Sequence, residues 1–264
     1  MLKKWGLVLG AGGSRGVAHA GFIKALEEAK LSPDFVTGCS MGAIVGGCYA
    51  KGISADFMKG ELLTLKPRHL VDLSLRPFHN KAFLRSKKVR KKMGSYLGED
   101  TFNDLKIPFS CVAVDVVSGK TKTFSGEEKV LDGVLASSAI PCVFKPVQYG
   151  NMLLVDGGIK QRLPIEQVRE MGAEVVVVVD VLGGMRVMEG KKRLPSMLFR
   201  MIDVYDTALA EEKLKLQAPD LYLTPDLGNM SQYKFKGLDN AYQKGYELGI
   251  KNVSAIKSLI GIEN

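Results

Sequence analysis

Histidine, cysteine and long apolar runs are all scarce in this sequence. It has 3 histidines and 4 cysteines in 264 residues, and no apolar run approaches the roughly 18 to 20 residues that a membrane-spanning helix needs. The cysteines lack the paired spacing of zinc sites and the density of a disulfide scaffold; they are Cys39, Cys48, Cys111 and Cys142. Glycines interrupt the first apolar run before it reaches signal-peptide length. We therefore expect a cytoplasmic chain, soluble or peripheral to a membrane.

The composition is otherwise that of an ordinary globular protein. Apolar residues make up 46% and charged residues 25%, which suffices for a substantial core in a single domain over residues 1–264. The net charge of +9 suggests an anionic partner, which could be a membrane surface, a charged substrate or nucleic acid.

Short apolar runs alternate with helical periods along the chain. Strands are predicted at 5–9, 35–38, 109–117, 120–124, 152–155 and 175–181, with a hairpin at Ser118-Gly119. Helices are predicted at 16–30, 41–51, 55–65, 86–97, 129–138, 164–171, 197–216 and 240–260. A strand followed by a helix, repeated, is typical of a parallel sheet, so we predict a three-layer α/β/α sandwich with a mainly parallel central sheet. Residues 182–195 are expected to form a surface loop, and residues 65–85 a mobile cover.

The segment from Gly38 to Gly42 fits the pattern GxSxG between a strand and a helix. A serine on such a turn has a strained backbone that lifts its hydroxyl out of the sheet, and glycines on both sides avoid collisions. Ser40 is therefore the candidate nucleophile, and the following helix presents its first N–H groups, beginning with Met41, to a developing oxyanion. The alternative is a chance match in which glycines only allow close packing.

A glycine-rich loop from Gly10 to Gly16 follows the first predicted strand. Its N–H groups could hold a pyrophosphate or an oxyanion. A dinucleotide site would require GxGxxG spacing and an acidic residue at the end of the second strand, where Ser40 stands instead. An oxyanion hole is the better interpretation, and Arg15 is expected to support the loop by hydrogen bonds, with contact to a lipid phosphate as the alternative.

The base that activates the serine is not an obvious histidine. His19 lies on the first predicted helix, whereas His69 and His79 fall among basic loop residues, and none follows a late strand. Asp156 ends an apolar strand and precedes Gly157 and Gly158, which leave room for close approach. A Ser40–Asp156 dyad would require Asp156 to be desolvated, because an exposed aspartate is a weak base; the alternative is an ordinary Asp-Gly turn.

These three motifs, in this order, closely resemble those of the patatin-like phospholipases, which include bacterial relatives of neuropathy target esterase. The resemblance extends to Gly16–Gly21 and to Ala136–Pro141 ahead of Phe144–Val147, and Cys39 replaces the threonine or other small residue usual there. It covers residues 6–164, and residues 165–264 are expected to complete the sheet and the helical layers. It implies an oxyanion loop containing Gly10, Gly12 and Gly13, the Ser40–Asp156 dyad, and hydrolysis of carboxyl esters in phospholipids, lysophospholipids or simpler lipids without metal or organic cofactor.

The densest basic cluster lies on one predicted helix and consists of Arg85, Lys87, Lys88, Arg90, Lys91 and Lys92. It could contact an anionic membrane surface or simply be a solvated face. Nucleic-acid binding is disfavoured, because no aromatic residues interleave with these charges. The alternative functions are a thioesterase or general carboxylesterase, which would use the same dyad, and a lipid-binding regulatory protein with little turnover.

Overall fold

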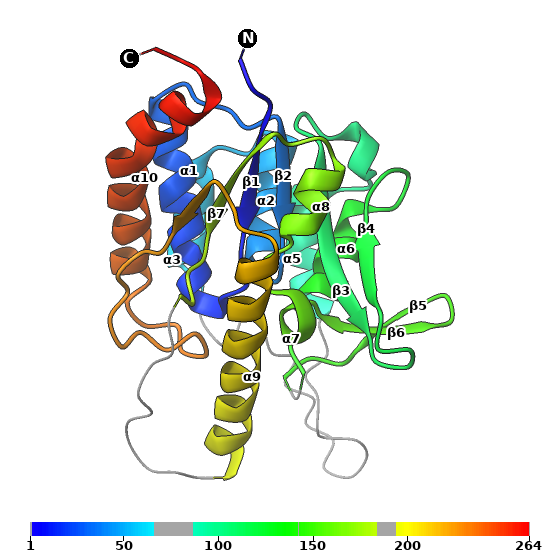
Figure 1. Cartoon of the computed structure of the whole chain (residues 1–264). Coiled ribbons are helices and arrows are strands. Elements are labelled where there is room, and N and C mark those ends of the chain that lie inside the picture. Colours follow the sequence, from blue (N-terminus) through cyan, green and yellow to red (C-terminus); the bar gives the residue numbers. More distant parts are fainter. Residues whose placement is uncertain (1, 66–86, 142, 184–193, 264) are drawn as a thin grey trace, which may run out of the picture.

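A central sheet with helices on both faces forms the body of the protein (Figure 1). The computed structural model describes residues 2–65, 87–141, 143–183 and 194–263. The strands are β1 (Trp5–Leu9), β2 (Phe35–Gly38), β3 (Phe109–Asp115), β4 (Thr121–Phe124), β5 (Val147–Tyr149), β6 (Met152–Asp156), β7 (Val175–Val179) and β8 (Leu221–Leu223). Their order in the sheet is β5-β6-β3-β2-β1-β7-β8, and β4 pairs with β3.

The sheet is mixed. β1, β2, β3, β7 and β8 form four parallel pairings, whereas β4, β5 and β6 join through three antiparallel ones. The antiparallel part begins at β3, where a hairpin leads to β4 and where β6 returns along the other edge. The catalytic candidates Ser40 and Asp156 therefore stand at the boundary between the parallel and the antiparallel parts of the sheet.

Nine helices in the described ranges cover the two faces. They are α1 (Val17–Glu28), α2 (Met41–Lys51), α3 (Ala55–Leu63), α5 (Lys87–Leu97), α6 (Val130–Ser137), α7 (Gly158–Gln161), α8 (Ile165–Glu170), α9 (Leu194–Leu216) and α10 (Leu238–Ile260), with short 3-10 turns at Gly13–Gly16 and Phe102–Asp104. Figure 1 shows α1, α3 and α10 on one side of β1 and α7, α8 and α9 on the other.

The strand alternation divides the core into two layers. Leu7 and Leu9 of β1 join the larger core, which contains α1, α2, α6 and α10, whereas Val8 points to the smaller core under α8 and α9. The five valines of β7 divide in the same way, and all are at most 2% exposed. A strand buried on both faces has no polar side, which is why β7 is a continuous apolar run.

The predicted α/β/α sandwich is confirmed, with differences in detail. The short strands β5 and β8 were not predicted, because three residues are too few for a periodic signal. α9 begins at Leu194, inside the predicted loop, of which residues 184–193 lie outside the described residues. The predicted cover at 65–85 also lies outside them, except for Leu65. β7 and β8 extend the sheet from β1, so the part of the chain after residue 164 adds strands to the same sheet.

Candidate active site

The turn between β2 and α2 holds Ser40 in a strained backbone conformation. Its φ is 55° and its ψ is −121°, and only one other non-glycine residue with a described position has a positive φ. The next glycine allows this turn to approach β1, because a Cβ on Gly42 would lie 2.0 Å from the carbonyl oxygen of Leu9. The predicted nucleophile elbow therefore has the geometry that its glycines suggest, and such strain is typical of functional sites.

Ser40 and Asp156 meet at one edge of β3, where the end of β2 and the end of β6 come together. Gly38 pairs with Cys111, and Asp156 pairs with Ala113, which is two residues further along β3. Ser40 also lies two residues beyond Gly38, so Ser40 and Asp156 reach the same level of β3. The hydroxyl of Ser40 donates a hydrogen bond to Oδ2 of Asp156, with 2.5 Å between the oxygens. Oδ1 of Asp156 accepts the backbone N–H of Gly158 at 2.8 Å, which fixes the carboxylate from its other side.

Burial makes Asp156 a stronger base than an exposed aspartate. The residue is 6% exposed, and this burial raises its pKa from 3.8 to about 6, although hydrogen bonds from Ser40 and Gly158 favour the ionised form. A pKa near 6 leaves the carboxylate ionised at neutral pH and brings its basicity closer to that of a histidine. The desolvation that the sequence analysis required is therefore present.

Three backbone N–H groups in the glycine loop and at the start of α2 remain available. Those of Gly12, Gly13 and Met41 make no hydrogen bond to another described residue. The N–H of Gly10, which was also expected in the oxyanion hole, donates instead to the carbonyl of Val179 at 3.0 Å. The N–H of Gly10 is thus used in the contact with the end of β7 and cannot serve as an oxyanion donor.

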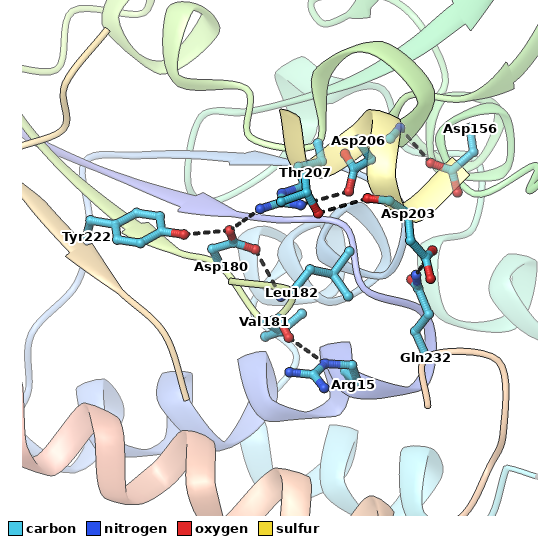
Figure 2. A network of polar contacts seen from close by, with 12 residues as sticks. Arg15, Asp156, Asp180, Val181, Leu182, Asp203, Asp206, Thr207, Tyr222 and Gln232 are labelled. Atoms are coloured by element: carbon cyan, nitrogen blue, oxygen red, sulfur yellow. Dashed lines mark hydrogen bonds and ion pairs between the residues drawn. The ribbon is translucent and has the colours of Figure 1, made fainter. Parts of the chain in front are cut away.

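The glycine loop is supported from behind by two buried side chains. His19 bonds through Nε2 to the carbonyl of Gly10 at 2.8 Å; burial lowers its pKa to about 4, so the neutral ring donates this hydrogen bond. Arg15 is 2% exposed and donates through Nε to the carbonyl of Val181 at 2.6 Å (Figure 2) and through Nη1 to Met230 at 3.0 Å. Arg15 thus holds the loop, and its burial keeps it from a lipid phosphate.

A buried ionic network lies behind the loop and was not visible in the sequence. Arg162 donates to Asp180 on β7's exit and to Asp206 on α9, both at 2.8 Å, and Tyr222 donates to Asp180 at 2.7 Å. Figure 2 shows Asp180 and Asp206 on either side of this network, with Asp156 beyond Asp206. Burial raises the pKa of Asp206 to about 6, against the effect of Arg162. The network ties α9 to the sheet next to Asp156.

A mainly apolar cavity of about 950 Å³ opens at Ser40. Its walls come from α2, α3, α5, the segment after α6 and the segment before α10; they include Ile44, Val45, Phe57, Met58, Leu62, Val89, Met93, Leu135, Ile140 and Phe235. Gly13 and Met41 also line it, so two of the available N–H donors belong to residues of the cavity wall. The space suits an extended apolar group whose reacting end reaches Ser40.

Five of the six residues of the basic cluster lie on α5, which borders this cavity. Arg85 lies outside the described residues, and the five remaining cations are exposed. Arg90 pairs with Asp132 at 2.8 Å, and Lys92 pairs with Glu61 at 2.5 Å. Lys88, Lys91 and Lys92 line the cavity, so cationic groups stand at its rim.

Two further features are absent from the described residues. None of their helices is long and apolar enough to cross a membrane. They also contain no group of three or more His, Cys, Asp or Glu side chains that could bind a metal ion. His69 and His79 lie outside the described residues.

Comparison with known proteins places this architecture in a family. The family model of the patatin-like phospholipases matches residues 7–169. The chain belongs to the patatin-like phospholipase family. An NTE family protein of Mycobacterium bovis is 34% identical over 178 residues, which cover 67% of this chain and 49% of that protein. A lysophospholipase of Emericella nidulans is 26% identical over 96% of this chain and 18% of its own length.

Solved structures share the patatin-like fold at low sequence identity. VipD from Legionella pneumophila aligns with a TM-score of 0.63 at 14% identity, over 96% of this chain and 67% of its own. The type III effector ExoU aligns with a TM-score of 0.50 at 14% identity, over 100% of this chain and 54% of its own. This patatin-like chain spans about half the length of the mycobacterial relative and less of the fungal one.

Proposed function

We propose that this chain is a serine acyl hydrolase that cleaves carboxyl esters of phospholipids, lysophospholipids or other lipids. The observation that carries this proposal is the 2.5 Å hydrogen bond from Ser40 to a buried carboxylate, at the end of an apolar cavity. The family membership and the name of the fungal lysophospholipase relative agree with it.

In the proposed mechanism, Ser40 Oγ bonds to the ester carbonyl carbon as its proton passes to Asp156. The carbonyl oxygen becomes an oxyanion that the N–H groups of Gly12, Gly13 and Met41 stabilise. When this intermediate collapses, the ester C–O bond breaks and the alkoxide leaves with the proton held by Asp156. A water then gives its proton to Asp156 and attacks the acyl group, which leaves as the fatty acid while Ser40 regains the proton.

Labelling by a fluorophosphonate probe tests the proposed chemistry. Intact mass should show one adduct on the wild-type protein and none on Ser40→Ala or Asp156→Asn, because the first lacks the nucleophile and the second lacks the base. A substrate panel of lysophospholipids, acyl thioesters and short-chain esters then separates a lipid hydrolase from a thioesterase or a general esterase. Absence of labelling in the wild type would refute the hydrolase and favour a lipid-binding protein.

The exposed cations of α5 are proposed to contact an anionic membrane surface. Lys91 stands at the cavity rim and Lys87 is on the same helix, whereas Arg90 and Lys92 are paired with acidic side chains. A bilayer bound there would face the cavity entrance. Each cation near such a surface contributes about 1 kcal/mol to binding at most.

Vesicle sedimentation with a charge-matched control tests this contact. The variant Lys87→Glu/Lys91→Glu should bind vesicles of anionic phospholipid at least about ten-fold more weakly than the wild type. The control Lys30→Glu/Lys251→Glu changes the net charge equally at exposed positions away from the cavity and should keep most of the binding. Equal losses in both variants would mean that only net charge matters and would reject a defined contact.

A further inference from the structure

The end of α6 contacts both catalytic residues through their backbones. Oγ of Ser137 accepts the N–H of Ser40 at 3.0 Å. Two residues later, the carbonyl of Ala139 accepts the N–H of Asp156, also at 3.0 Å. One short segment is therefore hydrogen-bonded to the nucleophile and to its base.

This connection matters because β2 and β6 are not neighbours in the sheet. They lie end to end along one edge of β3, where β2 pairs with Phe109–Cys111 and β6 with Ala113–Asp115, so no backbone ladder joins the turn of Ser40 directly to the end of β6. The turn of Ser40 and the end of β6 are connected in two ways. Both adjoin β3, and both are hydrogen-bonded to the end of α6, through Ser137 and Ala139 respectively. The separation of Ser40 and Asp156 thus depends on the position of this segment as well as on the sheet.

The bond to Ser137 also gives the strained turn a partner for its N–H. Ser40 has a positive φ and is 4% exposed, so water is largely excluded from its backbone. A buried N–H without an acceptor is unfavourable, and the turn would relax toward another conformation to satisfy it. An acceptor at Ser137 removes that tendency.

The two adjacent serines of α6 have different surroundings. Ser137 is 0% exposed and is not among the residues of the cavity wall. Ser138 lines the cavity and donates its hydroxyl to the carbonyl of Val134 at 2.7 Å, within its own helix. Only Ser137 bonds to the nucleophile turn.

We propose that Ser137 is a positioning residue that holds the Ser40 turn so that the hydroxyl stays on Asp156. This inference rests on the proposed hydrolase function. Loss of the acceptor should slow the attack by Ser40 and leave ligand affinity unchanged, because Ser137 does not reach the cavity.

The test compares the rate of probe attachment with its affinity. An alkyl fluorophosphonate gives kinact and KI for the wild type, Ser137→Ala, Ser137→Thr and Ser110→Ala. Ser110 is a matched control: it is 2% exposed on β3, its hydroxyl contacts Met171 Sδ at 3.5 Å, and it does not line the cavity. Thermal unfolding of each variant shows whether it is folded.

Ser137→Ala should lower kinact roughly ten- to a hundred-fold, as small misplacements of a nucleophile do, with KI and the midpoint of the pH dependence unchanged. Ser137→Thr, which keeps the hydroxyl, should recover most of kinact, and Ser110→Ala should match the wild type. The inference is overturned if Ser137→Ala keeps wild-type kinact, if Ser110→Ala loses as much, or if Thr and Ala at position 137 react equally slowly. Failure of the wild type to react at all would overturn the hydrolase function with it.

Discussion

Replacing Asp156 by asparagine should abolish activity and at the same time stabilise the protein at high pH. Asp156 is buried, and its pKa in the folded protein is about 6 against 3.8 for an unperturbed aspartate. The folded state therefore binds this proton more tightly than the unfolded state does. Stability from this group is fully present below pH 3.8 and is lost as the pH rises through about 6.

The size of the effect follows from the two pKa values. The gap between 3.8 and about 6 corresponds to roughly 3 kcal/mol at pH 8. The same linkage gives less than about 1 kcal/mol at pH 4 and about 2 kcal/mol at pH 5. Asparagine has no charge to bury, so the stability of Asp156→Asn relative to wild type should rise by about 2 kcal/mol between pH 4 and pH 8.

Urea unfolding of both proteins at pH 4, 5 and 8 measures this difference directly. Ser40→Ala is the control, since it is equally inactive and retains the buried carboxylate, so it should show no such pH-dependent gain over wild type. A free-energy difference between Asp156→Asn and wild type that stays constant from pH 4 to pH 8 would refute the account of a desolvated base.

Three further outcomes are expected. Below a midpoint near pH 6, kcat/KM should fall with decreasing pH, because protonated Asp156 cannot accept the serine proton; a stopped assay with buffers from pH 4.5 to 8 measures it. Gly13→Ala should reduce kinact about a hundred- to a thousand-fold, because the shift it causes would displace a proposed oxyanion donor. The position has φ +51°, and a Cβ there would lie 2.3 Å from the carbonyl oxygen of Gln232. A variant with wild-type kinact would argue against the N–H of Gly13 as a donor. Arg162→Met should destabilise the fold by about 3 to 5 kcal/mol in urea unfolding, because its two aspartate partners would stay buried without their cation. Arg169 is half-exposed, so the control Arg169→Met should change stability by less than about 1 kcal/mol. Equal losses of stability in the two variants would contradict this reasoning.

The sequence reveals the turn of Ser40, the proposed nucleophile, because its geometry demands particular residues. Gly42 approaches β1 so closely that no side chain fits there. Ser40 has a positive φ, which is uncommon for a serine outside a functional site. Such constraints appear directly as a local pattern. The pattern does not show which backbone N–H groups are free to bind an oxyanion. The sequence-based expectation therefore includes Gly10, although its N–H donates to the end of β7.

Features that depend on tertiary contacts were not visible. Nothing local distinguishes Ser137 from Ser138, since which serine faces Ser40 depends on how α6 lies across the sheet. The partners of Arg162 come from β7's exit and from α9, and a charged residue in a sequence is ordinarily expected at the surface. Likewise, the sequence does not distinguish paired from unpaired cations in the basic cluster, whereas the structure pairs Arg90 and Lys92 with acidic residues from other helices.

In the proposed mechanism, the arrangement explains how a carboxylate can replace histidine as the base. An aspartate with a pKa of 3.8 would hold the serine proton too weakly, and the same residue with a pKa of about 6 is still ionised at neutral pH and accepts the proton more readily. The shift comes mainly from burial, which destabilises the folded protein by the roughly 3 kcal/mol worked out above. The N–H of Gly158 and the hydroxyl of Ser40 bond to the carboxylate and lower its pKa in part, but burial outweighs them, and Ala139 holds the backbone N–H of Asp156 without touching the carboxylate. Arg162, the buried cation nearby, is instead paired with Asp180 and Asp206, so its charge is already balanced and the basicity of Asp156 is preserved.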